Sequence, residues 1–242
     1  AGQRAVTGTG AAAATGAGTA IVKGFALTGA PTGMNRNPAA GRGIDSAYVI
    51  ARRPHHVAYY PGAEPMFIKL VFSPETGKVL GAQIVGGPGV DRRIDIIATV
   101  IHFGGTIDDL AQLDLAYSPQ YGAAKDPVHI AAMIAQNQRD GLLKHVDPDA
   151  VAKLRDAGVQ LIDVSTAEEF AACTIPGAKN LPIDELRLRL DELDPNKPVV
   201  VFCAIGQRGY LAYRILTQRG FTDVTSVAGG LAWYKSQGLP TA

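Results

Sequence analysis

The chain has 242 residues, a net charge of +1, and 47% hydrophobic against 19% charged residues. This length and balance are typical of a globular protein with two domains. Basic and acidic residues are interspersed without a basic stripe, so we expect no nucleic-acid partner. The longest apolar runs are far shorter than the roughly 20 residues that span a bilayer, so we expect no membrane contact.

The first 18 residues are rich in Gly and Ala and contain no Leu, Ile or aromatic side chain. We therefore expect a flexible terminus over 1–18. The glycine pairs that start at Gly8 and Gly16 lack the preceding strand and the following helix of a dinucleotide-binding loop. The terminus also lacks the regions of a signal peptide, and the chain has two cysteines, so we expect a cytoplasmic protein with reduced thiols.

Residues 19–137 carry the pattern of an α+β domain with an antiparallel sheet. The apolar runs 66–72 and 79–85 flank a turn with Pro74 and Gly77, which predicts a β-hairpin. The other predicted elements are strands over 19–23 and 47–51, and helices over 90–103, from about 106, and over 129–136. The charged residues of the first of these helices are expected on a solvated face; they are Asp91, Arg92, Arg93 and Asp95.

The polar segment 138–148 is expected to be a linker. Beyond it, over 149–242, short apolar strands alternate with helical segments. The strands are predicted over 159–163, 178–181, 198–203 and 224–227, and the helices over 167–172, 183–193, 209–219 and 230–237. This alternation predicts an α/β/α domain whose parallel sheet is covered on both faces.

Cys203 is the strongest candidate for chemistry. It ends an apolar strand and precedes a tight loop and a helix, so backbone N–H groups and the positive end of the helix can stabilise a thiolate. A thiolate there is a nucleophile. The alternative is a buried strand-end cysteine without a chemical role. No metal site is expected, since His55, His56 and His129 lack partners at ligand spacing.

The second domain resembles a rhodanese domain over about residues 149–242. The motifs are Leu161-Ile-Asp-Val164, Glu168-Glu-Phe170, Ile175-Pro-Gly-Ala178, Asn180-Leu-Pro182, Cys203-x-x-Gly206-x-Arg208, and Ala228-Gly-Gly-Leu231 with Trp233. The resemblance implies that Cys203 accepts a sulfane sulfur from a small donor as a persulfide and passes it to a thiol. The substrate-binding loop would consist of Ala204, Ile205, Gly206, Gln207 and Gly209, with Arg208 catalytic.

Loop size distinguishes this site from a phosphatase. Four residues separate Cys203 from Arg208, whereas cysteine phosphatases use five. Two positions depart from the rhodanese pattern: Ser165 stands where Arg is common, and Cys173-Thr174 where Gly-His is common. The resemblance therefore does not specify thiosulfate as the donor. Cys173 is either structural or a resolving thiol.

The first domain resembles the dimerisation domain of flavin disulfide reductases, and most closely that of coenzyme A-disulfide reductases, some of which carry a C-terminal rhodanese domain. The motifs lie in Gly18–Lys23, His56–Gly62, Thr76–Gly86, Val90–Asp95 and Leu115–Pro127. The resemblance implies a homodimer through residues 19–137. It also implies that Tyr60, or its neighbour Tyr59, and Tyr121 reach the active site of the partner subunit. Packing at the interface is the alternative role for these tyrosines. Lys125 and Asp126 are expected to anchor the Tyr121 loop or a charged cofactor.

The domains that bind FAD and NAD(P)H in that family have no counterpart in this sequence. The chain therefore resembles the C-terminal part of the parent reductase, and we expect it to hold no cofactor alone, with FAD, NAD(P)H and coenzyme A used by the parent enzyme. Two hypotheses remain. The chain is either a sulfurtransferase that works with such a reductase, or a non-catalytic module that dimerises and binds a sulfur donor.

Overall fold

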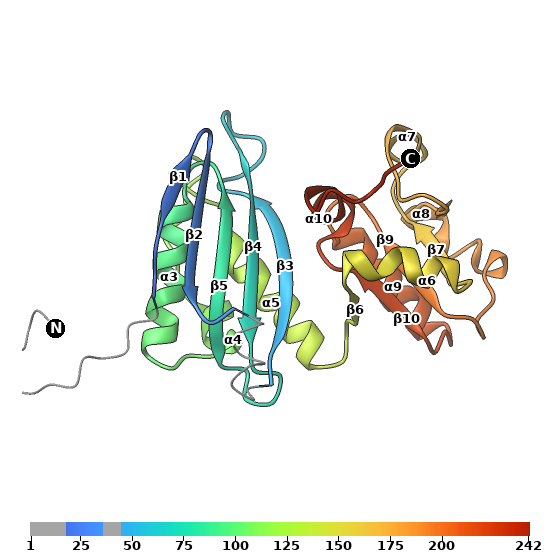
Figure 1. Cartoon of the computed structure of the whole chain (residues 1–242), viewed down its shortest axis with the longest axis horizontal. Coiled ribbons are helices and arrows are strands. Elements are labelled where there is room, and N and C mark those ends of the chain that lie inside the picture. The colour runs from blue at the N-terminus through green and yellow to red at the C-terminus, as the bar shows by residue number, and fades with distance from the viewer. Residues whose placement is uncertain (1–17, 36–44) are drawn as a thin grey trace, which may run out of the picture.

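The computed structural model describes residues 18–35 and 45–242, which form two domains side by side (Figure 1). The terminus that we expect to be flexible, with the glycine pair at Gly8, lies outside the described residues except for Gly18. The first domain is α+β and the second is α/β/α, so the predicted fold class is confirmed.

The first domain contains an antiparallel sheet with strand order β1-β2-β5-β4-β3. Its strands are β1 (Val22–Gly24), β2 (Leu27–Gly33), β3 (Ala47–Pro54), β4 (Pro65–Phe72) and β5 (Val79–Gly86). The predicted hairpin is confirmed by the pairing of β4 with β5. Strand β2 is not predicted, because Gly29, Pro31 and Gly33 disfavour strands; pairing with β1 and β5 stabilises it nonetheless.

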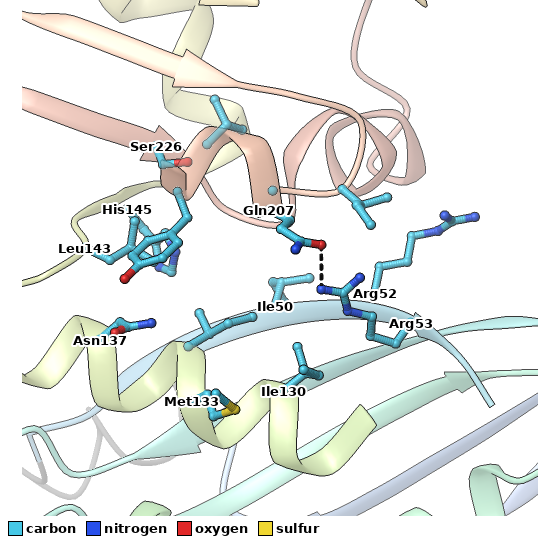
Figure 2. Close-up of a pocket in the computed structure, with 16 residues that line it drawn as sticks. Ile50, Arg52, Arg53, Ile130, Met133, Asn137, Leu143, His145, Gln207 and Ser226 are labelled. Carbon is cyan, nitrogen blue, oxygen red and sulfur yellow. Dashed lines mark hydrogen bonds between the residues drawn. The ribbon is translucent and has the colours of Figure 1, made fainter. Parts of the chain in front are cut away.

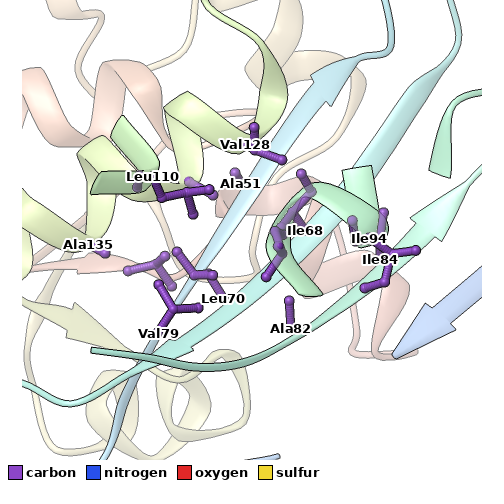
Figure 3. Close-up of a cluster of buried hydrophobic side chains, with 14 of the residues drawn as sticks. Ala51, Ile68, Leu70, Val79, Ala82, Ile84, Ile94, Leu110, Val128 and Ala135 are labelled. Atoms are coloured by element: carbon purple, nitrogen blue, oxygen red, sulfur yellow. The ribbon is translucent and has the colours of Figure 1, made fainter. Parts of the chain in front are cut away.

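Three helices cover one face of this sheet: α3 (Val90–His102), α4 (Ile107–Gln112) and α5 (Pro127–Arg139). Alternate side chains of the strands pack against them in a single core (Figure 3). The fully buried members include Ile68, Leu70 and Ile84 from the sheet and Ile94, Leu110, Val128 and Ala135 from the helices. Burial on this scale is what stabilises the domain and fixes the orientation of α5.

The prediction that the charged residues of α3 lie on a solvated face is wrong at one position, Arg93. Arg93 is 1% exposed, and it forms an ion pair with Asp126, with 2.6 Å between Nη2 and Oδ2. Its guanidinium also donates to the carbonyls of His55 and Gly89. A buried Arg requires such a complete set of acceptors. Asp126 in turn caps α5 by accepting from the N–H of Val128, so one ion pair joins three segments.

The segment 138–148, expected to be a linker, is structured. Helix α5 extends to Arg139, Leu143 packs in the core of the second domain, and β6 (His145–Val146) pairs with β10. The remaining strands of the second, parallel sheet are β7 (Gln160–Asp163), β8 (Lys179–Asn180), β9 (Val199–Phe202) and β10 (Val224–Val227), and the order is β6-β10-β9-β7-β8.

The parallel sheet has a core on each face. Its helices are α6 (Val151–Asp156), α7 (Ala167–Ala172), α8 (Ile183–Leu186), α9 (Gln207–Gln218) and α10 (Gly230–Ser236), with short 3-10 turns at Pro148–Ala150 and Leu190–Glu192. Val199 and Val201 pack with α8 and α9, whereas Val200 and Phe202 pack with α6 and α10. The alternation along β9 therefore assigns its side chains to opposite faces, as expected for a covered parallel strand.

The helix predicted over 183–193 is shorter than expected. It ends at Leu186 as α8, and a 3-10 turn follows at Leu190–Glu192. Arg189 lies between them with φ −122°, outside helical values. Its guanidinium bonds Glu185 and Glu192 and thereby closes the turn.

The two domains contact one another through the face of the first sheet that the helices leave free. The rings of Phe67 on β4 and Trp233 on α10 lie 5.3 Å apart between centroids, and the Tyr48 hydroxyl donates to Asp147. A Cβ atom on Gly229 would approach Ile50 to 2.7 Å. Strand β3, at the edge of its sheet, thus lies beside the loops that surround α9 and α10.

Candidate active site at the Cys203 loop

Cys203 lies directly after β9, at the carboxyl edge of the parallel sheet, and is 1% exposed. Its carbonyl accepts from the N–H of Leu231 at 2.9 Å, and the carbonyl of Ala204 accepts from Ala232 at 2.9 Å. The loop is therefore fastened to the start of α10. This placement confirms the strand, loop and helix order that the sequence predicts around Cys203.

The loop offers a set of uncommitted donors. Within the described residues, the N–H groups of Ile205 through Gly209 donate to no protein acceptor. Helix α9 begins at Gln207, so these groups include its first turn, where N–H groups have no partner inside the helix. Gly206 has φ +92°, a conformation that favours glycine and lets the loop curl. Such a loop stabilises an anion.

Gly230 allows the loop and α10 to approach closely. It has φ +64°, and a Cβ atom there would lie 2.4 Å from the carbonyl oxygen of Cys203 and 2.7 Å from the nitrogen of Gly206. Both contacts are with backbone atoms, which cannot rotate away as a side chain would. Glycine at this position therefore sets the shape of the Cys203 loop.

Arg208 is held beside the thiol by a carboxylate. Its two terminal nitrogens donate to Glu169 at 2.6 and 2.8 Å. This bidentate contact lowers the pKa of Glu169 to about 2 and raises the pKa of Arg208, to which the electrostatic interaction with Cys203 also contributes. Glu169 is itself placed by its capping box with Thr166 at the start of α7. Arg208 is thus oriented toward the sulfur by Glu169, a residue for which the sequence analysis gives no role.

Arg53, from β3 of the first domain, is a second cation at this site. It interacts electrostatically with Cys203, and its Nη2 donates to Oε1 of Gln207 at 2.9 Å. The role of Arg53 cannot be predicted from the sequence, because Arg53 and Gln207 are 154 positions apart and no local pattern links the two domains.

One of the two departures from the rhodanese pattern, Thr174, bonds a buried carboxylate with its side chain. Asp163, at the end of β7, is 0% exposed. It accepts from the N–H of Ser165 at 2.9 Å and from the hydroxyl of Thr174 at 2.8 Å. Both residues are buried. Thr174 is a structural partner of Asp163 through its hydroxyl, whereas Ser165 contributes a backbone N–H that any residue there would supply. Cys173 packs with the core on the face opposite that of Cys203, which favours its structural role.

The tyrosine loops lie together at the end of β3. The N–H of Val57 donates to the carbonyl of Gly122, and Arg92 donates to the carbonyl of Tyr121. Tyr59 and Tyr121 are exposed, whereas Tyr60 is half-buried and packs on the ring of His56.

A third exposed tyrosine, Tyr117, interacts with Tyr59, and this interaction raises the pKa of Tyr117. Tyr59, Tyr117 and Tyr121 are therefore the exposed phenols of these loops, whereas Tyr60 is half-buried.

Over 18–35 and 45–242, no cluster of three or more His, Cys, Asp or Glu could hold a metal ion. No described helix is long and apolar enough to cross a bilayer. The same ranges contain no Gly-x-Gly-x-x-Gly turn between a strand and a helix, so they do not fit the pyrophosphate of FAD or NAD(P)H.

The fold and the loop define a two-domain chain with a cysteine in an anion-stabilising loop at the edge of a parallel sheet. Residues 19–127 match the dimerisation domain of the pyridine nucleotide-disulphide oxidoreductases, and residues 147–237 match the rhodanese-like domain. The chain therefore combines these two domains in this order, and the resemblance that the sequence shows is confirmed.

Several relatives of this chain share both domains or one of them. The coenzyme A disulfide reductase of Staphylococcus epidermidis is 33% identical to this chain over 119 residues. That of Staphylococcus aureus is 32% identical to it over 113 residues. These matches cover 49% and 47% of this chain but 27% and 25% of the relatives. The chain thus spans about a quarter of the length of these reductases.

Two solved structures resemble nearly the whole chain. The reduced CoADR-RHD protein of Bacillus anthracis superposes with a TM-score of 0.88 and 40% sequence identity. The match covers 91% of this chain and 39% of the Bacillus anthracis chain. The NAD-dependent persulfide reductase of A. fulgidus has a TM-score of 0.81 and 43% identity, with coverages of 89% and 38%. Both likenesses extend over the two domains and the junction between them.

Proposed function

We propose that the chain is a rhodanese-type sulfurtransferase in which Cys203 carries a sulfane sulfur as a persulfide. The observation that supports this most directly is the set of free N–H groups over Ile205–Gly209, combined with the Arg208 guanidinium beside the sulfur. A persulfide is an anion under ordinary conditions, and these donors stabilise an anion.

Transfer takes place in two displacements. The Cys203 thiolate attacks the outer sulfur of a donor, the donor S–S bond breaks, and the remainder of the donor leaves with the electron pair. An acceptor thiolate then attacks the outer sulfur of the Cys203 persulfide, which releases Cys203 as a thiolate. No electrons are gained or lost overall, so the loop has to stabilise only the thiolate and the persulfide.

We further propose that this chemistry supplies a coenzyme A-disulfide or coenzyme A-persulfide reductase that uses FAD and NAD(P)H. The similarity to coenzyme A disulfide reductases and to an NAD-dependent persulfide reductase supports this context. The chain would form a homodimer through residues 19–137 in the cytoplasm, with Tyr60 and Tyr121 near the active site of the partner subunit. The exposure of Tyr121 and Tyr59 favours Tyr59 over Tyr60 for contact with a partner.

One observation favours a second candidate function. The Cys203 side chain is almost fully enclosed, as it would be in a module that binds an anionic sulfur donor without transferring its sulfur. Turnover separates the two functions, because only the sulfurtransferase releases thiocyanate when cyanide is the acceptor.

The test is the rate of thiocyanate release with thiosulfate and with glutathione persulfide as donors. We expect turnover that Cys203→Ser reduces to the uncatalysed background and that Cys173→Ser leaves in place. Arg208→Lys should lower kcat/KM by about tenfold, because Lys cannot make the bidentate contact with Glu169. Equal rates for the wild-type chain and Cys203→Ser would rule out the sulfurtransferase and leave the binding module.

A further inference from the structure

A cavity of ≈ 180 Å³ lies between the two domains, against the Cys203 loop (Figure 2). Ile205, Gly206 and Gln207 form part of its wall. Its apolar lining comes from both domains: Ile50, Ile130, Met133, Ile134, Leu143 and Tyr210. A largely apolar cavity with a few polar groups is the usual form of a small-molecule site.

Arg53 connects this cavity to Cys203. It lines the cavity, bonds Gln207 and interacts electrostatically with the Cys203 thiol. Burial lowers its pKa, yet within the described residues it has no carboxylate partner. A partly desolvated guanidinium without a counter-charge favours an anion, such as a thiolate, at the cavity end nearest Cys203.

His145 provides an independent indication that the cavity has an occupant. Its side chain lines the cavity, and its Nδ1 is shielded from solvent and has no hydrogen-bond partner in the described parts of the chain. Burial lowers the pKa of His145 to about 4 despite the opposing charge of Asp147, so the imidazole is neutral at neutral pH. An unpartnered buried nitrogen is costly unless a ligand or water bonds it.

We propose that the cavity between the domains binds the sulfur acceptor, a thiol with a short unbranched apolar chain, and that Arg53 holds its thiolate toward the Cys203 persulfide. The proposal rests on the sulfurtransferase function above and specifies the class of acceptor. The chain of the thiol lies against Ile130 and Met133, and a polar group at its far end reaches His145 (Figure 2).

The steric test compares three acceptors: cyanide, 2-mercaptoethanol and 6-mercapto-1-hexanol. We expect kcat/KM to be about tenfold higher for the longer thiol than for the shorter one, since each buried methylene contributes. Met133→Trp, which fills the cavity from α5, should abolish this preference. No preference in the wild-type chain, or the same preference in Met133→Trp, would overturn the proposal. Absence of turnover with every acceptor would instead contradict the sulfurtransferase function.

The electrostatic test uses Arg53→Gln. This change should lower kcat/KM for both thiols about fivefold to tenfold and move the acidic limb of their pH profile to higher pH, because the thiolate loses a stabilising charge. Arg219→Gln removes the same charge at the other end of α9, where Arg219 is exposed, and should change neither quantity. An unshifted pH profile in Arg53→Gln would overturn the role of Arg53.

Binding can be measured without turnover. In the Cys203→Ser chain, 6-mercapto-1-hexanol should raise Tm in proportion to the logarithm of its concentration, because a ligand that binds only the folded state stabilises it. The same thiol should leave the Tm of the Cys203→Ser, Met133→Trp double variant unchanged. A Tm that does not respond in the Cys203→Ser chain would overturn the cavity as a binding site, whatever the rates.

Discussion

At the scale of single residues, the ion pair between Arg93 and Asp126 is the most consequential contact of the first domain. Both side chains are 2% exposed, and Arg93 also bonds His55 just before the loop that carries Tyr59 and Tyr60. Asp126 closes the loop that carries Tyr121. Both tyrosine loops therefore depend on a single buried guanidinium.

We predict that Arg93→Met lowers the free energy of unfolding of the first domain by about 3–5 kcal/mol, because it leaves the Asp126 carboxylate buried without its partner. Arg92→Met, on the same helix, removes contacts to the exposed carbonyls of Ala116 and Tyr121 and should cost less than about 1.5 kcal/mol. Chemical denaturation of both variants measures the difference. Similar costs for the two would contradict the assigned role of Arg93.

The residues of the Cys203 loop could be predicted because their signal is local: a strand, a short spacing and a glycine lie within a few positions of one another. Arg208 follows from the same spacing. Arg53 and His145 could not be predicted, since one comes from the other domain and the other from a segment that reads as a polar linker. Their importance arises only from the packing of β3 and β6 against the loop.

At the scale of elements, the junction between the Cys203 loop and the start of α10 controls the shape of the site. We predict that Gly230→Ala lowers sulfurtransfer far more than it lowers stability, because a Cβ atom at this position displaces the backbone of Cys203 and Gly206. Gly238→Ala is the matched control. Gly238 has φ +71° but open space around it, so it carries the same conformational cost without the clash.

Rates and Tm values of the two glycine variants decide this prediction. We expect the left-handed conformation to lower stability by about 1 kcal/mol in each variant, and the backbone clash to add to this loss in Gly230→Ala. The rate should fall at least tenfold in Gly230→Ala alone. A normal rate in Gly230→Ala would show that the loop does not need this close approach.

Elements with a strong periodic pattern were predictable, and elements defined by tertiary contacts were not. The β4–β5 hairpin and α9 follow from alternation, turn residues and helical spacing. Strand β2 contains Gly29, Pro31 and Gly33, and β6 has two residues. Both exist because a neighbouring strand pairs with them, which is information that a single segment does not contain.

At the scale of the whole molecule, β3 joins the two candidate sites. Arg53 lies near its end, and the loop that carries Tyr59 and Tyr60 begins after Pro54. A change in how the domains pack would therefore act on the Cys203 site and on the tyrosine loop together. This continuity is consistent with a chain in which sulfur carried by Cys203 is used close to the first domain.

The junction between the domains should also make stability depend on pH. The pKa of His145 is about 4 in the folded chain and about 6.5 when unfolded. Between these values the unfolded chain binds a proton that the folded chain does not, so stability falls as pH decreases from 6.5 to 4. Between pH 6.5 and pH 4 the free energy of unfolding falls by about 2–3 kcal/mol, since a shift of one pKa unit corresponds to about 1.4 kcal/mol.

Denaturation of the wild-type chain and of His145→Gln at pH 7 and pH 4.5 tests this dependence. Other titrating groups contribute equally to both proteins, so the difference between the two pH slopes isolates His145. We expect the variant to lose less stability on acidification than the wild-type chain. Parallel slopes would show that His145 is not buried in its neutral form.

The intact mass of the chain after treatment with a sulfane-sulfur donor measures directly whether Cys203 carries sulfur. We expect glutathione persulfide to add one sulfur atom to the wild-type chain and to Cys173→Ser, peptide mapping to place it on Cys203, and an acceptor thiol to remove it. A Cys203 that stays unmodified, or a sulfur atom that is retained in Cys203→Ser, would rule out Cys203 as the sulfur carrier.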